Sequence, residues 1–564
     1  MNSKGKKIAV YAIYYAAATL LLAIGYYVTL PAINPYSTDF WYSLAVVLLV
    51  YLLPVVGIRT LAESFKTSAA KKTRPALPKK AFLLLAVLLP IVIVLVGNLL
   101  SSPFFFAKRY ASVIEVTDAE FATDKHMQET DRVENIALMD SETAVVYGNR
   151  ELGNLSDVVS QFELSNNYTQ INYEGSPKKV ANLEYADFFK WLGNRDVGIP
   201  GYVMVDPVAN DAKYVKLEEN IRYAESGFFG EDLMRKLRFE YPTKIFGTPR
   251  FEIDETGAPF YIVPCLSPRV FLFGAFDVSE VIIFDPTDGS SEIHSVKEIR
   301  AEENKERFNW IDTVYDGDLA TQKYNWKGVY SGGFLNSIIG NKGCTQTTDD
   351  YGYLMLDGDV WYFTGVTSLT SDASNIGFIL TNARTGDYKF YSVKGAEEHS
   401  AMGAAEGEVQ EKGYVASFPS LINIRGEATY IMVLKDSGAR VKLYAMVNVE
   451  QFNIVATGET QQEAKAKYIE KLIENGVIEG AVDQAPTDNV TEMTVTIDAI
   501  TPVTTAGESY LYLRGKDAEE KVVLLKKKIA DDESVLFLAV GDVIRTTVSP
   551  TDASGVYTLL TFEK

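Results

Sequence analysis

A chain of 564 residues, with 47% hydrophobic and 23% charged residues, is too long for one ordinary domain and apolar enough to form packed cores. Its net charge of −20 is divided unevenly: residues 1–110 carry twelve Lys and Arg against two acids, and the remainder carries 42 basic and 72 acidic residues. The acidic remainder repels phosphates, which disfavours nucleic acid as a partner, and disfavours acidic wall polymers unless divalent cations bridge the contact.

Three uncharged apolar runs occupy residues 8–28, 41–58 and 81–100. Each is close to the ~20 residues that a helix needs to cross the hydrocarbon core of a bilayer. A secretory signal is disfavoured for the first run, because no clean small-residue cleavage site follows it and two more runs come after. The sequence therefore predicts three transmembrane α-helices within a membrane domain, residues 1–105.

Lysine and arginine set the expected orientation of these helices. The first residues and the segment 59–80 are basic, whereas residues 29–40 contain no Lys or Arg. Because cytoplasmic loops carry the excess of basic residues, we expect a multi-pass protein of the cell membrane with a cytoplasmic N-terminus. Everything after about residue 101 is then extracytoplasmic. There Cys265 and Cys344 could form a disulfide or stay as two separate buried thiols.

The body begins with an expected α/β domain, residues 106–245, and then repeats itself. In three hairpins a glycine is followed four residues later by a tyrosine: Gly257 and Tyr261, Gly358 and Tyr362, Gly426 and Tyr430. Residues 282–296 also align with 379–393 without a gap. The pattern predicts three related antiparallel units, at 246–300, at 301–400 together with an aromatic connector, and at 401–480, where a helix ends the third unit.

The last segment, residues 489–564, contains five runs with strand character in about 75 residues. Five short strands predict a small closed β-barrel that resembles an OB-fold, with an SH3-like barrel or a small sandwich as alternatives.

The repeated hairpins resemble PepSY-type domains, through residues 285–296 and 382–393 and the hairpins at Gly257 and Gly358. The resemblance implies small extracytoplasmic α/β modules, found with secreted peptidases and envelope proteins, that bind or inhibit other proteins. Residues 196–475 also look like a family of membrane-anchored bacterial envelope proteins, a resemblance that implies no particular activity. The expected fold class is three transmembrane helices, an α+β body of duplicated PepSY-like units, and an OB-like barrel.

Acidic residues around Gly289 look like a calcium loop, but their spacing does not fit an EF-hand. The aligned copy also replaces them: Asp285, Asp288 and Glu292 correspond to Asn382, Thr385 and Lys389. We therefore expect a hairpin turn whose Asp and Gly supply turn geometry, and we expect no metal or other cofactor.

Glu397, Glu398 and His399 form the most polar cluster of the body, with Glu406 nearby. Paired carboxylates can perform acid–base chemistry when their pKa values differ, although the many Gly and Ala residues around this cluster favour tight packing. We consider it a candidate binding surface. A carboxylate-dependent wall hydrolase using Glu397, Glu398 and Glu406 is the alternative.

Aromatic residues gather in the connector between two units, where exposed rings would favour peptide or carbohydrate contacts and buried rings would form core. They are Trp310, Tyr315, Tyr324, Trp326 and Tyr330. The sequence predicts a non-enzymatic, membrane-anchored envelope protein without catalytic residues, whose modules bind envelope proteins or peptidoglycan. A membrane sensor that signals through a partner is a further alternative.

Overall fold

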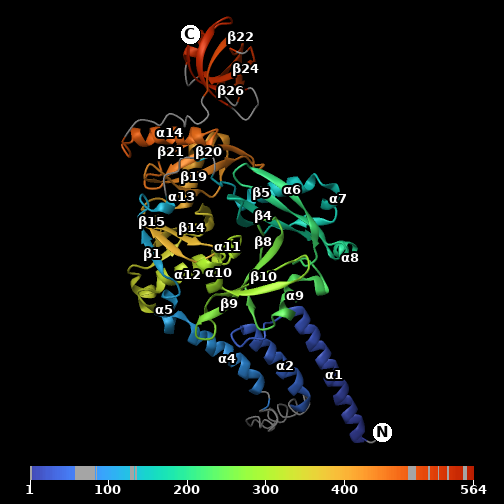
Figure 1. Ribbon diagram of the computed structural model, residues 1–564. Helices are drawn as coiled ribbons and strands as arrows, with labels where there is room; N and C mark the ends of the chain where they lie inside the picture. Colours follow the sequence, from blue (N-terminus) through green and yellow to red (C-terminus); the bar gives the residue numbers. More distant parts are fainter. Residues whose placement is uncertain are drawn as a thin grey trace. The chain divides into compact units, whose positions relative to one another are not determined.

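The computed structural model describes residues 3–56, 83, 85–127, 133, 136–479, 491–505, 508–518, 520–529, 533–550 and 556–564. The chain divides into two compact units, Met1–Leu472 and Ile473–Lys564 (Figure 1). The basic segment 59–80, on which the expected orientation partly depends, lies outside the described residues.

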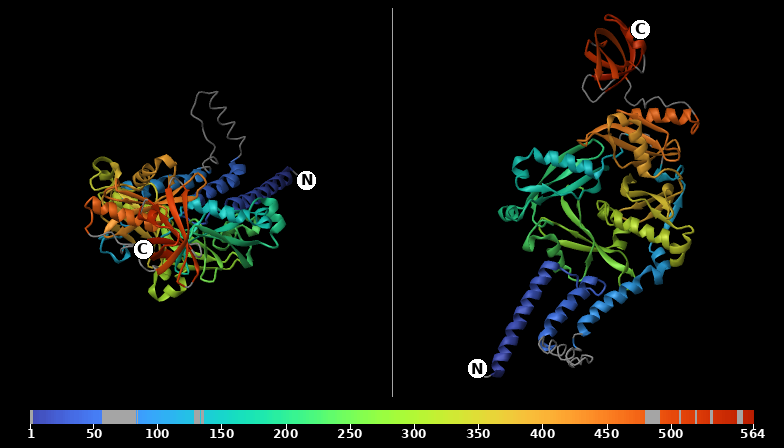
Figure 2. Two further views of the ribbon diagram at one scale, coloured as in Figure 1. Left: turned by 90° about the horizontal axis from the view of Figure 1, so that it is seen from above. Right: turned by 180° about the vertical axis from the view of Figure 1, so that it is seen from behind.

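Apolar helices open the first unit and extend from one end of it (Figures 1 and 2). They are α1 (Ser3–Thr29), α2 (Thr38–Val56), α4 (Leu85–Ser101) and α5 (Pro103–Ala111). Their ends dock on the body: Arg238 donates to the carbonyl of Leu30 over 2.9 Å, and the amide of Phe273 donates to the Ser101 hydroxyl over 3.0 Å.

The prediction of three transmembrane helices is wrong for the described residues. Only Ile8–Thr29 is long and apolar enough to cross a membrane by itself. The apolar part of the second helix, Thr38–Leu52, is too short, and Leu85–Ser101 reaches the necessary length only together with α5, across a bend of 53°. A count of uncharged residues does not detect such a bend, which falls where Pro103, lacking the amide that would continue the hydrogen bonds of α4, opens α5.

The body consists mostly of β-sheet, which corrects the expected α+β class. Its strands form four sheets that share a five-stranded topology, and one of the four gains a sixth strand, β1 (Val116–Ala119). In each sheet two short strands pair with opposite ends of one long strand, and two further strands follow antiparallel. One main helix, capped by an acidic residue, precedes each sheet. We call these elements repeats 1 to 4: residues 140–221, 232–295, 316–391 and 397–458. The first lies within the segment expected to be a separate α/β domain.

Repeats 1 and 2 share one core, in which Tyr202 and Phe284 are almost fully buried. The elements of repeat 1 are α6 (Ser141–Gly153), α7 (Ser156–Val159), β2 (Phe162–Leu164), β3 (Thr169–Tyr173), β4 (Ser176–Tyr185), α8 (Phe188–Asn194), β5 (Ile199–Asp206) and β6 (Asp211–Ile221). Those of repeat 2 are α9 (Leu233–Glu240), β7 (Ile245–Phe246), β8 (Arg250–Ile253), β9 (Pro259–Val270), β10 (Gly274–Phe284) and β11 (Ser291–Ser295), followed by α10 (Val296–Arg300) and α11 (Lys305–Phe308).

Repeats 3 and 4 share a second core, which includes Phe378 and Tyr430. The elements of repeat 3 are α12 (Gly317–Tyr330), a π-helical turn (Asn336–Gly340), β12 (Thr345–Thr347), β13 (Gly352–Leu356), β14 (Asp359–Ser368), β15 (Ser371–Asn382) and β16 (Tyr388–Tyr391); β1 (Val116–Ala119) pairs parallel to β16. Those of repeat 4 are α13 (Glu398–Glu408), β17 (Val415–Ala416), β18 (Ser420–Ile424), β19 (Glu427–Lys435), β20 (Val441–Asn448) and β21 (Val455–Gly458), followed by α14 (Gln461–Glu474).

The stretch that resembles a calcium loop is a turn found in all four repeats. The Asp285 carboxylate accepts from the amide of Thr287 over 2.8 Å, an Asx turn. In the other repeats Asp206 and Asn382 accept from the amide two residues on in the same way, and Asn448 accepts from the amide three residues on. Either Asp or Asn satisfies this geometry, which explains why the aligned copies differ in charge.

The same turn joins each of repeats 2 to 4 to the segment before its own helix. The carbonyl of Pro286 accepts from the amide of Tyr223 over 2.9 Å, and the carbonyl of Ala383 accepts from that of Tyr315 over 2.8 Å. Gly289 lies against the Tyr223 ring, where an added Cβ would be 2.5 Å from the nearest ring atom. The turn glycine is thus required for this approach as well as for its positive φ of 80°.

The second unit contains a closed five-stranded barrel around its own apolar core. Its strands follow the order β22-β23-β24-β26-β25, in which only β24 and β26 run parallel. They are β22 (Thr491–Thr505), β23 (Glu508–Lys516), β24 (Val522–Lys528), β25 (Val543–Pro550) and β26 (Val556–Glu563). The closed order distinguishes a barrel from a small sandwich.

Candidate functional site

The hairpins of repeats 1, 3 and 4 meet around two adjoining cavities of about 220 and about 430 Å³. Ala137, Gln170 and Tyr353 line both cavities, so together they form one depression, which we call the hairpin groove. The smaller cavity is its apolar section and the larger cavity its polar section.

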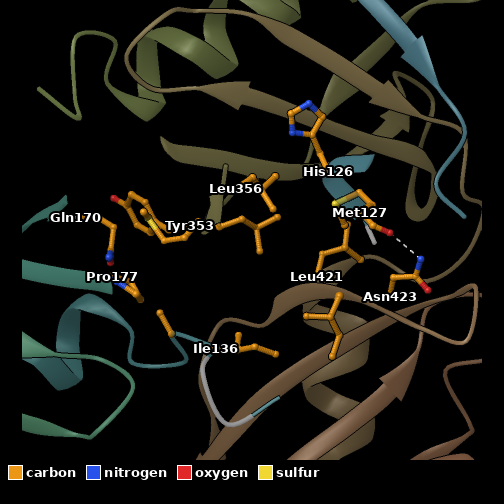
Figure 3. A pocket seen from close by; sticks show the side chains of 13 residues that line it. His126, Met127, Ile136, Gln170, Pro177, Tyr353, Leu356, Leu421 and Asn423 are labelled. Carbon is orange, nitrogen blue, oxygen red and sulfur yellow. Dashed lines mark hydrogen bonds between the residues drawn. The ribbon is translucent and has the colours of Figure 1, made fainter. Parts of the chain in front are cut away.

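The apolar section lies between β3–β4, β13 and β18 (Figure 3). Leu356, Leu421 and Met127 surround it, and Tyr353 closes the side toward Gln170. Asn423 fixes one wall, because its side-chain amide donates to the carbonyl of Met127 over 2.7 Å. This section can take an apolar side chain, since little of its lining can form hydrogen bonds.

Lys179 is the distinctive residue of the polar section. It lies on β4 opposite Gln170, is only 3% exposed, and places its Nζ 4.7 Å from the centroid of the Tyr353 ring. Within the described part of the chain no hydrogen bond to this Nζ is found. Burial lowers the pKa of Lys179 to about 8, although the charge of Asp140 acts in the opposite direction.

Two other charged pairs line the polar section. Asp140 caps α6 and bonds with Lys435, whose Nζ also donates to the Thr143 hydroxyl over 3.0 Å. His399 Nε2 lies 3.1 Å from an Asp350 oxygen at the exposed rim. Asp140 and Asp350 are therefore engaged by other side chains, whereas Glu142, the third acid of the lining, is exposed, and the amine of Lys179 is the buried group that a ligand can still approach.

The other repeats show why Lys179 is unusual. Lys179 comes four residues after Gly175, the glycine of the β3–β4 hairpin. It therefore occupies the position that Tyr261, Tyr362 and Tyr430 hold in the other three repeats. The hydroxyl of Tyr362 donates to the carbonyl of Tyr315 over 3.0 Å, and that of Tyr430 donates to the carbonyl of Ala396 over 3.2 Å. Both acceptors directly precede a helix cap, so the tyrosine joins hairpin to helix. Repeat 1 has an amine in place of this hydroxyl.

Of the polar cluster predicted from sequence, only His399 lines the hairpin groove. Glu397 caps α13 and accepts from the amide of Ser400, and Glu398 is buried and accepts from the amide of Gly365 over 2.6 Å. Glu406 accepts from the amide of Ala416 over 2.9 Å. The three carboxylates therefore bind three separate backbone amides. Burial raises the pKa of Glu398 to about 7.

The five aromatic residues of the connector do not form one surface. Tyr315 and Tyr324 are buried, and the Trp310 ring packs 4.9 Å from that of Phe260. Trp326 and Tyr330 both pack edge-on against Tyr110, with ring centroids 5.3 and 6.1 Å away.

Cys265 and Cys344 are both buried and free, so the structure contains two separate thiols and not a disulfide between them. Burial raises the pKa of the Cys265 thiol to about 12, which makes it unreactive. Among the residues that the structure describes, no group of three or more His, Cys, Asp or Glu side chains is placed to hold a metal ion.

Comparison with known proteins adds little to this description. No family model matches the chain, and no curated protein matches it. Among solved structures, a Trypanosoma rangeli sialidase in complex with 2,3-difluorosialic acid is similar at 9% identity and a TM-score of 0.16, over 71% of this chain and 53% of the sialidase. The chain thus spans about half of that sialidase, and a likeness this low carries no argument about fold or activity.

Proposed function

We propose that the protein is a non-enzymatic, membrane-anchored binding protein whose hairpin groove receives a segment of another envelope protein. An acidic group of that segment lies against Lys179, and a neighbouring apolar side chain enters the section between β13 and β18. The observation that carries the proposal is the buried amine of Lys179, which faces a cavity and has no bonded counter-charge among the residues that the structure describes.

The binding free energy would come from the buried charge of Lys179. A buried cation without a hydrogen-bonded partner is unfavourable, and a carboxylate that reaches it forms a charge-assisted hydrogen bond in surroundings with little water. Tyr353 already stabilises the positive charge through its ring face, which keeps the amine available to a ligand. A protein segment fits better than a small ion, because the adjoining apolar section offers a second contact that an ion cannot use.

The anchor in this proposal is α1. Its apolar side chains are largely exposed on the first unit, as expected for a membrane anchor or a signal sequence. Lys4, Lys6 and Lys7 precede its apolar part. Because basic residues are in excess on cytoplasmic segments, these lysines place the N-terminus in the cytoplasm. A single span at α1 then leaves the repeats outside the cytoplasm.

The test uses the full chain in detergent and labelled hexapeptides that pair Asp or Glu with Leu or Phe. Their Asn and Gln counterparts serve as uncharged probes. Fluorescence anisotropy should show about tenfold tighter binding of the acidic peptides, because a hydrogen bond to a charged group contributes roughly 1.5–3 kcal/mol. Lys179→Met should abolish this preference.

Lys178→Met is the matched control, since Lys178 is the adjacent residue on β4, pairs with Asp206 and lines a different cavity. It should keep the full preference for acidic peptides. A preference that persists in Lys179→Met would remove the basis of the proposal.

The absence of enzymatic activity stays a prediction, as does the resemblance to PepSY-type domains. The backbone bonds of Glu397, Glu398 and Glu406 support the non-enzymatic alternative over a carboxylate-dependent hydrolase, because these side chains do not converge on a shared position.

A further inference from the structure

A second cavity of about 910 Å³ lies where α5 meets repeats 2 and 3. Five cations line it, from four different parts of the chain: Arg109, Arg269, Lys297, Arg300 and Lys323. We call it the cationic cavity. Such a gathering is unexpected in a chain with a net charge of −20.

The acids of the cationic cavity neutralise only part of this charge. Asp277 bonds with both Arg269, over 3.2 Å, and the buried Lys323, over 2.6 Å. Asp387 pairs with Arg300. Glu115 is the remaining acid of the lining, so five cations face three acids.

Arg109 and Lys297 are the two exposed cations of this lining that form no ion pair within the described part of the chain. Arg109 lies on α5, with its guanidinium 5.3 Å from the centroid of the Phe106 ring. Lys297 lies in the first turn of α10, beyond the strand that ends repeat 2. An anion in the cavity could thus be bound by two exposed cations, Arg109 and Lys297, whose charges the acids of the lining do not pair.

An exposed apolar patch adjoins the cationic cavity. Phe104 is 57% exposed five residues before Arg109 on α5, and its ring packs 5.1 Å from that of Phe334. Phe334 leads into the π-helical turn, where Leu335 is 70% and Ile339 80% exposed. The patch continues the surface of α4, which together with α5 has the length and composition of a bent membrane segment.

We propose that the cationic cavity binds the phosphate of an anionic lipid headgroup, while the apolar patch enters the membrane interface beside it. Guanidinium and ammonium groups bind phosphate oxygens through charge-assisted hydrogen bonds. Apolar side chains next to basic ones are the combination that holds proteins at the surface of anionic membranes. Free phosphate has the same chemistry, but it would make no use of Phe104, Leu335 and Ile339.

The experiment measures ligand binding to the full chain in a non-ionic detergent. Dihexanoyl phosphatidylglycerol is the anionic probe, dihexanoyl phosphatidylcholine the zwitterionic one, and inorganic phosphate the headgroup chemistry without acyl chains. We expect the anionic lipid to bind most tightly, and the double variant Arg109→Gln and Lys297→Gln to weaken it roughly 30-fold, from about 1 kcal/mol per basic residue near an anionic surface.

Lys412→Gln is the matched control, because it removes one exposed positive charge from repeat 4, far along the chain from α5. It should leave lipid binding unchanged. Leu335→Ser and Ile339→Ser should weaken binding of the lipid but not of inorganic phosphate. Equal affinity for the lipid in wild type and the double variant would overturn the proposal. Inorganic phosphate binding as tightly as the anionic lipid would overturn the assignment to a membrane.

Discussion

Replacement of the buried Lys179 by methionine should stabilise the protein while it abolishes the preference for acidic peptides. Methionine has nearly the same length and fills the same space beside Tyr353, but it removes the amine that burial disfavours. The pKa of Lys179 is lowered from 10.5 to about 8 in the folded protein. This difference in pKa corresponds to about 3 kcal/mol. The free energy of unfolding is lower by this amount at neutral pH, because the buried amine stays protonated.

The sign of the pH dependence follows from the protons bound in each state. Between pH 8 and 10.5 the unfolded chain holds the Lys179 proton and the folded protein has released it, so the free energy of unfolding of the wild type rises with pH over this window. The advantage of Lys179→Met is therefore largest below pH 8. It decreases as the pH rises toward 10.5, where both states are neutral.

Thermal unfolding of the full chain in detergent, followed by circular dichroism at several pH values, measures this difference. At about 2.1 cal/mol/K per residue over the roughly 280 residues of the four repeats, 3 kcal/mol corresponds to an increase in Tm of about 5 °C at pH 7. The control Lys178→Met loses a partly exposed ion pair and should lower stability by at most about 1 kcal/mol. A Tm of Lys179→Met below that of wild type at pH 7 would contradict the reasoning.

Three further predictions concern buried groups and turns. Burial raises the pKa of Glu398 from 4.5 to about 7, so between these pH values the folded protein binds a proton that the unfolded chain has lost. The free energy of unfolding of the wild type therefore falls, by up to about 3 kcal/mol, as the pH rises through this range. Glu398→Gln should remove this fall, which Tm measurements at pH 5 and pH 8 would show. Gly289→Ala should lower the free energy of unfolding by roughly 2–4 kcal/mol, because the added Cβ would lie 2.5 Å from an aromatic ring atom. Gly426 has a similar positive φ but open space around it, so Gly426→Ala should lower the free energy of unfolding by only about 1 kcal/mol. Equal effects of the two variants in denaturant titrations would refute the role of the ring. Unfolding under non-reducing conditions should expose two titratable thiols per chain, from Cys265 and Cys344, and a value near zero would show that they pair.

The repeats were partly predictable because their hairpins depend on local rules. Gly257, Gly358 and Gly426 adopt positive φ at the turn, and the tyrosine four residues later is buried each time, so both leave a pattern in the sequence. Repeat 1 was not predicted as a related unit, because the residue four positions after Gly175 is Lys179 and not a tyrosine. The substitution that hid the first repeat is therefore the one that creates the candidate site.

The burial of Lys179 could not be predicted, because it depends on contacts far along the chain. In the sequence it follows another lysine in the string Ser176-Pro177-Lys178-Lys179, which is typical of a solvated strand end. Its position beside Tyr353 results from the meeting of hairpins more than 170 residues apart. The polar cluster at Glu397 could be found in the sequence because its members are neighbours along the chain. Helix-capping residues lie next to each other in this way whether or not they have a function.

The attachment of the apolar helices to the body has a mechanical consequence. The last turn of α1 docks on α9 through Arg235, and Leu30 after it docks through Arg238, while the end of α4 docks on the β9–β10 hairpin at Phe273. Both attachments belong to repeat 2, so a tilt of α1 relative to α4 would apply a torque to that repeat. The Asx turn of repeat 2 is fastened to the end of repeat 1, so the torque would pass to repeat 1, and from there to the β4 strand that carries Lys179. For the membrane-anchored protein proposed above, a force on α1 would thus have a mechanical route to the hairpin groove.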